Sequence, residues 1–151
     1  IIEAAGGRNV AATGRAGVAR VSLEQVLGWA PDWVLTQDRN FFRAAQGDAV
    51  WRTLPAIREG RLLLAPDLPF GWLDGPPSVN RLLGVKWLAA HLRRGRPEGA
   101  SVASASGAAP ATQAMNQVLR EAIDDALRFH ALFYGVTPSR EAVQGWLDGR
   151  G

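Results

Sequence analysis

Residues 38–40 bring together three polar side chains that could hold a ligand. Asp38, Arg39 and Asn40 supply a carboxylate, a guanidinium and an amide in direct succession. An arginine can bind a carboxylate or an oxyanion through two parallel hydrogen bonds, which makes this triplet a candidate binding site. The alternative is ordinary turn chemistry, for which Asp and Asn are common residues. The sequence by itself leaves both interpretations open.

A second candidate lies in the loop 66–77, which carries four prolines. Phe70, Trp72 and Asp74 place two aromatic rings and a carboxylate on this stiff, irregular stretch. Large apolar groups on a rigid, exposed loop suit a preformed binding surface. The alternative is that the two aromatic side chains pack into the core.

Catalytic and metal chemistry find no support in the sequence. The absence of cysteine excludes disulfides, cysteine-ligated zinc, iron–sulfur clusters and thiol catalysis. There is no Gly-rich phosphate-binding motif and no GxSxG motif. His91 and His130 stand on predicted helices without a second ligand at the i+4 spacing, so we interpret them as surface or half-buried packing residues. We therefore predict no catalytic residue, no metal ligand and no cofactor, and hence no enzyme.

The composition of the chain further limits the classes of protein to which it could belong. The net charge of +3 is too small to indicate nucleic-acid binding, and no apolar run approaches the roughly 18 residues of a membrane span. With 151 residues the chain is long enough for one domain with its own core. The first seven residues, Ile1 to Gly7, resemble the last turn of a helix with a C-terminal glycine, so we expect further protein upstream.

Strands and helices alternate in the predicted structure. Short β-prone runs at 33–36 and 61–65 are predicted as buried strands. Helices are predicted at 23–29, 41–45, 50–58, 79–90, 115–133 and 137–147. The helix after Ser78 has one apolar face, made of Val79, Leu82, Leu83, Trp87 and Ala90. Residues 95–114 are almost all small or polar and are predicted to be a mobile surface insertion.

This alternation predicts an α/β fold, a three-layer sandwich in which helices flank a small parallel sheet. In such sheets ligands sit beyond the carboxyl ends of the strands. The loops 37–42 and 66–77 leave those ends. We therefore expect both candidate groups to line one face.

Five segments of the chain resemble one family in the order that family has them. They are Ala5–Val10 (AGGRNV), Ser22–Leu35 (SLEQVLGWAPDWVL), Trp51–Leu62 (WRTLPAIREGRL), Pro76–Leu88 (PPSVNRLLGVKWL) and Leu132–Val136 (LFYGV). The family comprises the periplasmic binding proteins that serve ABC importers of iron-siderophores, haem and cobalamin. The fourth segment is similar to a subgroup that includes iron-chelate and molybdate or tungstate binders.

The resemblance implies that residues 1–151 are the C-terminal lobe of a bilobed binding protein whose N-terminal lobe is absent here. It implies a protein, periplasmic or lipid-anchored at the outer face of the cytoplasmic membrane, that binds an iron chelate or related metal complex between its lobes. The ligand contacts would come from Asp38, Arg39, Asn40, Phe70, Trp72 and Asp74. Glu24 would dock to the permease subunits. The alternatives are a molybdate or tungstate binder of the same family, a small α/β enzyme domain, or a stand-alone interaction domain.

Overall fold

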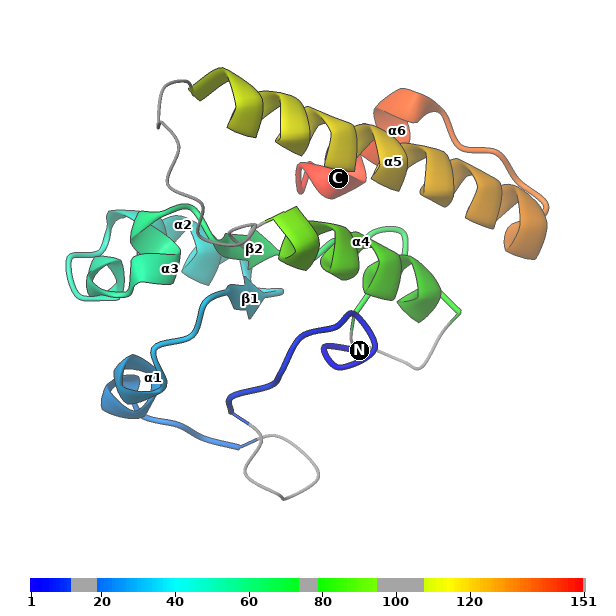
Figure 1. Ribbon diagram of the computed structural model, residues 1–151. Helices are drawn as coiled ribbons and strands as arrows, with labels where there is room; N and C mark the ends of the chain where they lie inside the picture. Colours follow the sequence, from blue (N-terminus) through cyan, green and yellow to red (C-terminus); the bar gives the residue numbers. More distant parts are fainter. Residues whose placement is uncertain (12–18, 74–78, 95–107, 151) are drawn as a thin grey trace. The chain divides into compact units, whose positions relative to one another are not determined.

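The computed structural model describes residues 1–11, 19–73, 79–94 and 108–150 (Figure 1). Contacts within the chain group these residues into two units. We call Arg8–Ala65 the sheet unit, and Ile1–Gly7 together with Pro66–Gly151 the helical unit. The α/β class with a small parallel sheet, predicted from the sequence, is confirmed.

The sheet unit is built on two parallel strands. In its described residues β1 (Val34–Thr36) pairs with β2 (Leu62–Leu64), and Leu35 lies opposite Leu63. The amide of Ala65 extends the ladder by donating to the carbonyl of Thr36 at 2.8 Å. Leu62 and Leu63 are buried, as expected for strands of a sheet that helices cover.

Helix α1 (Leu23–Trp29) begins at the residue the sequence predicts. The Ser22 hydroxyl accepts from the amide of Gln25 at 3.2 Å, and the Gln25 side chain accepts from the amide of Ser22 at 2.8 Å. This capping box satisfies two amides that otherwise have no partner at a helix start. The helix ends at Ala30, one residue before Pro31.

The next two predicted helices were placed imperfectly. Helix α2 (Arg39–Gly47) begins two residues before the predicted start, because Asp38 caps it. The predicted helix at 50–58 is divided into a 3-10 turn, η1 (Trp51–Thr53), and α3 (Pro55–Arg58). Leu54 lies between them in an extended conformation, since a proline disfavours a helical residue ahead of it.

A hydrophobic core lies among these elements of the sheet unit. Its buried members are Ala45, Leu54, Ile57 and Leu62, and residues of α1, β1, α2 and η1 pack against them. The T-shaped pair of Phe41 and Trp51, 4.9 Å between ring centroids, fixes α2 against η1.

The helical unit consists mainly of α4 (Arg81–Arg94), α5 (Ala108–Tyr134) and α6 (Arg140–Leu147). Helix α5 runs alongside α4 and also contacts α6 (Figure 1). Leu83, Trp87, Leu88 and Ala90 are buried on α4. Val79 and Leu82, which we placed on the buried face, are 42% and 57% exposed, so that part of the prediction was wrong.

Two further predictions for this unit need correction. Helix α5 starts at Ala108 and not at Met115, so residues 108–114 of the predicted insertion are helical. Alanine has the highest helix propensity, and Pro110 falls in the first turn, where its missing amide costs nothing. Residues 95–107 lie outside the described part of the chain. Helix α6 begins at Arg140, capped by Ser139, and not at Thr137-Pro138.

The first residues form the predicted helical end. Gly6 has φ +85°, and the amide of Gly7 donates to the carbonyl of Ile2 at 2.9 Å. These are the marks of a Schellman termination. Within the described residues, no helix is long and apolar enough to cross a membrane.

Candidate functional site

The side chain of Asp38 caps the start of α2. Its Oδ1 accepts from the amides of Asn40 at 2.8 Å and Phe41 at 3.1 Å, and its own amide donates to Thr36 Oγ1 at 3.0 Å. The carboxylate therefore occupies the amides that a helix start would otherwise offer to an anion. The turn interpretation of Asp38 is the one that its hydrogen bonds support.

The two neighbours of Asp38 differ in access to solvent. Arg39 is half-buried, whereas Asn40 is exposed in the first turn of α2. Both follow the carboxyl end of β1, where an α/β sheet presents ligand-binding residues. They stay candidates for ligand contact.

The loop after β2 separates its two aromatic residues. Trp72 has no exposed surface, and its Nε1 donates to the carbonyl of Leu68 at 3.2 Å. Phe70 is 53% exposed. A fully buried indole offers no surface to a ligand, so the burial of Trp72 supports the core interpretation. Asp74 lies outside the described residues.

The candidate residues fall in both units. Asp38, Arg39 and Asn40 belong to the sheet unit, and Phe70 to the helical unit. Their meeting on one face therefore stays a prediction.

Two residues that the sequence analysis did not select stand beside Phe70. Asn80, wholly buried, donates from Nδ2 to the carbonyl of Phe70 at 3.4 Å. Tyr134, at the end of α5, donates its hydroxyl to Asn80 Oδ1 at 3.1 Å. The ring of Tyr134 lies 6.1 Å from that of Phe70. A signal for Tyr134 was present, since it is the chain's single tyrosine and part of the LFYGV segment.

Glu24 is exposed in the first turn of α1. Hydrogen bonds from its own backbone amide and from the Ser22 hydroxyl hold the pKa of Glu24 below its usual value. It is therefore ionised at neutral pH and presents a negative charge to solvent.

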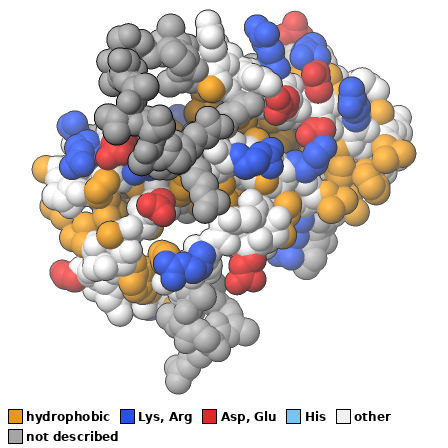
Figure 2. Space-filling model, in the orientation of Figure 1, with side chains coloured by type: hydrophobic (Ala, Val, Ile, Leu, Met, Phe, Trp, Pro, Cys, Tyr) orange, Lys and Arg blue, Asp and Glu red, His pale blue; other side chains and the backbone are white. Residues whose placement is uncertain are grey.

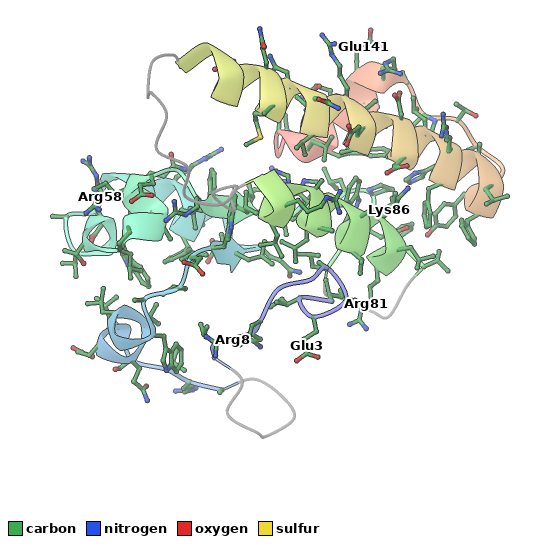
Figure 3. The ribbon with its side chains drawn as sticks, viewed as in Figure 1. Glu3, Arg8, Arg58, Arg81, Lys86 and Glu141 are labelled. Atoms are coloured by element: carbon green, nitrogen blue, oxygen red, sulfur yellow. The ribbon has the colours of Figure 1, made fainter. Side chains whose placement is uncertain are left out.

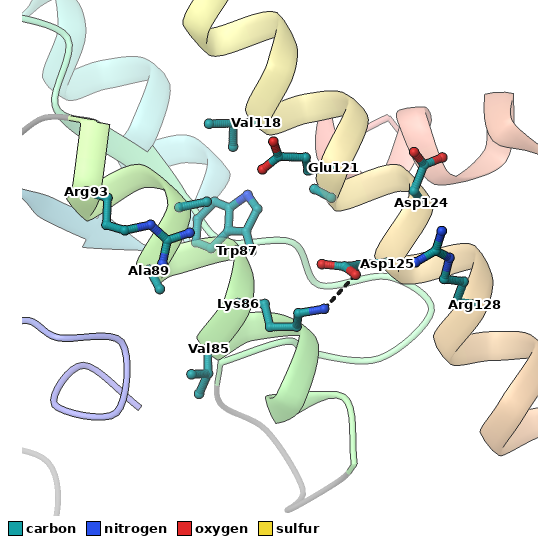
Figure 4. A pocket seen from close by; sticks show the side chains of 12 residues that line it. Val85, Lys86, Trp87, Ala89, Arg93, Val118, Glu121, Asp124, Asp125 and Arg128 are labelled. Atoms are coloured by element: carbon teal, nitrogen blue, oxygen red, sulfur yellow. Dashed lines mark hydrogen bonds and ion pairs between the residues drawn. The ribbon is translucent and has the colours of Figure 1, made fainter.

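A hollow of about 440 Å³ lies between α4 and α5. Its charged lining is balanced, with the cations Lys86, Arg93 and Arg128 and the anions Glu121, Asp124 and Asp125. Lys86 projects from α4 toward α5 (Figure 3), and its Nζ meets Asp125 Oδ1 at 2.6 Å across the hollow (Figure 4). Asp124 pairs with Arg140 at 2.7 Å. Because the charges of the lining balance and Lys86 pairs with Asp125, the hollow favours neither an anion nor a cation, and we do not place the ligand here.

Both histidines are buried, whereas the sequence predicted packing residues in surface or half-buried positions. Nδ1 of His91 lies 2.9 Å from the carbonyl of Trp87, and Nδ1 of His130 lies 2.8 Å from that of Ala126. Each ring thus bonds the preceding turn of its own helix, which is a packing role. No cluster of three potential metal ligands occurs among the residues that the structure describes.

No protein-family model matches the chain. In structure it is similar to an ABC transporter solute binding protein from Sulfurospirillum deleyianum DSM 6946, with a TM-score of 0.65 and 26% sequence identity. That match covers 87% of this chain and 34% of the other. The chain has the fold of part of an ABC transporter solute-binding protein. The predicted fold class is thereby confirmed.

A sequence relative carries a more specific name. The chain is 37% identical over 95 residues to the molybdate-binding protein MolA of Haemophilus influenzae (strain ATCC 51907 / DSM 11121 / KW20 / Rd). The alignment covers 61% of this chain and 26% of MolA. The chain thus spans about a quarter of MolA and about a third of the solved structure. Both are described as binding proteins, in line with the prediction of a binding protein and not an enzyme.

Proposed function

We propose that the protein containing this chain is the solute-binding component of an ABC importer, and that the chain is its C-terminal lobe. The observation that carries this proposal is the structural similarity to a solute-binding protein over 87% of the chain. The five segments that resemble periplasmic binding proteins support it independently, because they follow one another in the family's order.

The ligand we propose is molybdate or a related metal oxyanion. The support is the 37% identity to MolA. The iron chelate, which the sequence resemblance put first, has no support from this relative and becomes the second candidate. One observation favours a chelate: Phe70 and Tyr134 expose aromatic rings after the carboxyl end of β2 and at the end of α5.

Arg39 and Asn40 are the proposed polar ligand contacts, and Phe70 and Asp74 are further candidates. A guanidinium suits a tetrahedral oxyanion, because its parallel donors match two oxygen atoms. Asp38 would act indirectly, by fixing the first turn of α2 on which Arg39 and Asn40 stand.

Calorimetric titration of the full-length protein tests the ligand. We expect sodium molybdate and tungstate to bind and sulfate to bind more weakly, since the site must distinguish oxyanions by size. A ferric complex of 2,3-dihydroxybenzoate tests the second candidate. Absence of heat with all four ligands would contradict the proposed function.

The implied partners are the permease subunits in the cytoplasmic membrane and the protein's own N-terminal lobe. The protein would act in the periplasm, or at the outer face of that membrane through a lipid anchor. Glu24 is the proposed docking residue for the permease, because it is exposed and ionised at the start of α1.

Replacing Glu24 by glutamine is expected to reduce transport and to leave ligand affinity unchanged. Removing one partner of a buried interfacial charge pair costs about 2–5 kcal/mol, which is a loss of at least tenfold in permease engagement. Uptake of radiolabelled molybdate by reconstituted vesicles measures the first effect, and calorimetry the second.

Glu141 supplies the matched control for Glu24. It is exposed in the first turn of α6, two residues after the cap Ser139, as Glu24 stands two residues after Ser22 (Figure 3). Glu141→Gln removes the same favourable charge from a helix start and should leave uptake normal. Normal uptake with Glu24→Gln as well would reject the docking role.

A further inference from the structure

The carboxylate of Asp38 has one oxygen that the cap of α2 does not use. Oδ1 accepts from the amides of Asn40 at 2.8 Å and Phe41 at 3.1 Å. In the described part of the chain no hydrogen bond or ion pair engages Oδ2, and the residue is exposed. A carboxylate oxygen only accepts hydrogen bonds, so Oδ2 presents an acceptor and a negative charge at the carboxyl end of β1.

A ligand held by Arg39 and Asn40 meets that charge. Arg39 follows Asp38 directly, and the amide of Asn40 is hydrogen-bonded to the Asp38 carboxylate. Charges interact appreciably within a Debye length, which is about 10 Å at 0.1 M salt. Asp38 therefore acts on whatever these two residues bind, in addition to fixing the turn on which they stand.

The charges around this turn leave no excess to attract an anion. In residues 37–42 the positive charge of Arg39 is balanced by Asp38. The positive end of the α2 dipole is offset as well, because Asp38 accepts from the first amides of that helix. Figure 2 shows acidic and basic side chains interspersed on the visible face instead of gathered into one positive field. A fully ionised oxyanion is thus attracted by Arg39 and repelled by Asp38.

We propose that Asp38 determines which oxyanions this site accepts, by favouring an oxyanion that carries a proton over a fully ionised one. The inference rests on the proposed function and narrows its ligand class. An O–H group of the ligand donates to Oδ2, so that the carboxylate becomes a partner. An oxyanion without a proton turns only lone pairs toward Oδ2, and like charges that face each other are costly.

Titration calorimetry of the full-length protein at neutral pH and physiological salt tests this with inorganic phosphate and sulfate. Both are tetrahedral and similar in size, but only phosphate carries a proton at that pH. The wild-type protein should bind phosphate about tenfold tighter than sulfate, the difference expected for one hydrogen bond to a charged group.

Replacing Asp38 by asparagine should remove this preference. Asn caps a helix about as well as Asp, so α2 keeps its start, but the negative charge is gone. We expect molybdate and sulfate to bind about tenfold tighter than they bind the wild type. Asp38→Ser, which introduces another capping residue without charge, should show the same gain. Damage to the turn would lower affinity, so a gain identifies the effect of the charge.

Asp48 supplies the matched control. Its Oδ1 accepts from the amides two and three residues on, Val50 at 2.8 Å and Trp51 at 3.0 Å, in the pattern that Asp38 shows. It follows the last residue of α2, about 15 Å along the helix from Asp38 and farther than a Debye length. Asp48→Asn removes the same charge from the same kind of turn and should change no affinity. A gain equal to that of Asp38→Asn would overturn the inference.

The outcomes separate the inference from the function on which it rests. Wild-type protein that binds sulfate as tightly as phosphate overturns the inference and leaves the function standing. Asp38 variants whose affinity for molybdate is unchanged or lower do the same. Molybdate binding that appears only in the Asp38 variants supports the inference. If neither the wild type nor these variants bind any of the three oxyanions, the inference and the proposed function are both overturned.

Discussion

Replacing Gly84 by alanine is expected to disrupt the helical unit. A Cβ built on Gly84 would lie 2.0 Å from the carbonyl oxygen and 2.7 Å from the carbonyl carbon of Trp72. Overpacking usually costs about 1–3 kcal/mol when side chains can move aside, but here the obstacle is backbone. We expect a loss of at least about 3 kcal/mol, a large fraction of the roughly 5–15 kcal/mol that stabilises a domain.

Urea unfolding followed by far-ultraviolet circular dichroism measures this loss. The matched control is Gly28→Ala, because Gly28 also lies inside a helix, but a Cβ there would meet no atom within 4 Å beyond its own helix backbone. That change should stabilise α1 by up to about 1 kcal/mol, through helix propensity. A Gly84→Ala protein with a wild-type unfolding curve would refute the close approach of α4 to the loop.

Local sequence signals predicted the strands and the first helix of the sheet unit well. The capping box of Ser22 and Gln25 and the apolar runs of the strands both depend on neighbouring residues. The parallel pairing followed from the alternation of strand and helix, because parallel strands need a crossover connection. Patterns of this kind can be recognised in a short stretch of sequence, without knowledge of contacts between distant residues.

The structure of the helical unit was harder to predict from the sequence, because contacts between residues far apart in the chain determine which side chains are buried. Val79 and Leu82 fit the helical period of α4 but are exposed, since the described neighbours of α4 cover the side of Leu83 and Trp87. The small residues before Met115 suggested a mobile surface insertion, yet α5 extends back to Ala108. The composition of this stretch shows that it has few large apolar side chains to bury. A helix rich in alanine can still form there, because alanine has the highest helix propensity.

The candidate site was predicted only in part, for a related reason. Residue type indicated Arg39, Asn40 and Phe70, and their place after the strands supports them. Nothing local indicated that Asn80 would bond the Phe70 carbonyl or meet Tyr134 far along the chain. Asp38 was selected for its charge, but its hydrogen bonds serve the cap of α2.

Trp72 and Phe70 offer the clearest contrast between a core and a contact role in one loop. Trp72→Ala is expected to cost about 3–5 kcal/mol, because it deletes the largest fully buried side chain of the described residues and leaves a cavity. It also removes the indole donor that bonds the Leu68 carbonyl at 3.2 Å. Thermal or urea unfolding of the full-length protein measures this loss.

Phe70→Ala, two residues away, should cost less than about 1 kcal/mol, because more than half of that side chain is already in water. The two variants thus have opposite effects: Trp72→Ala lowers stability, and Phe70→Ala lowers ligand affinity at nearly wild-type stability. The comparison decides how the loop works. If Trp72→Ala kept its stability and lost only ligand affinity, the indole would be a ligand contact after all, and the buried position that fixes Phe70 would be wrong. With the expected result, one aromatic residue anchors the loop so that the other can face the ligand.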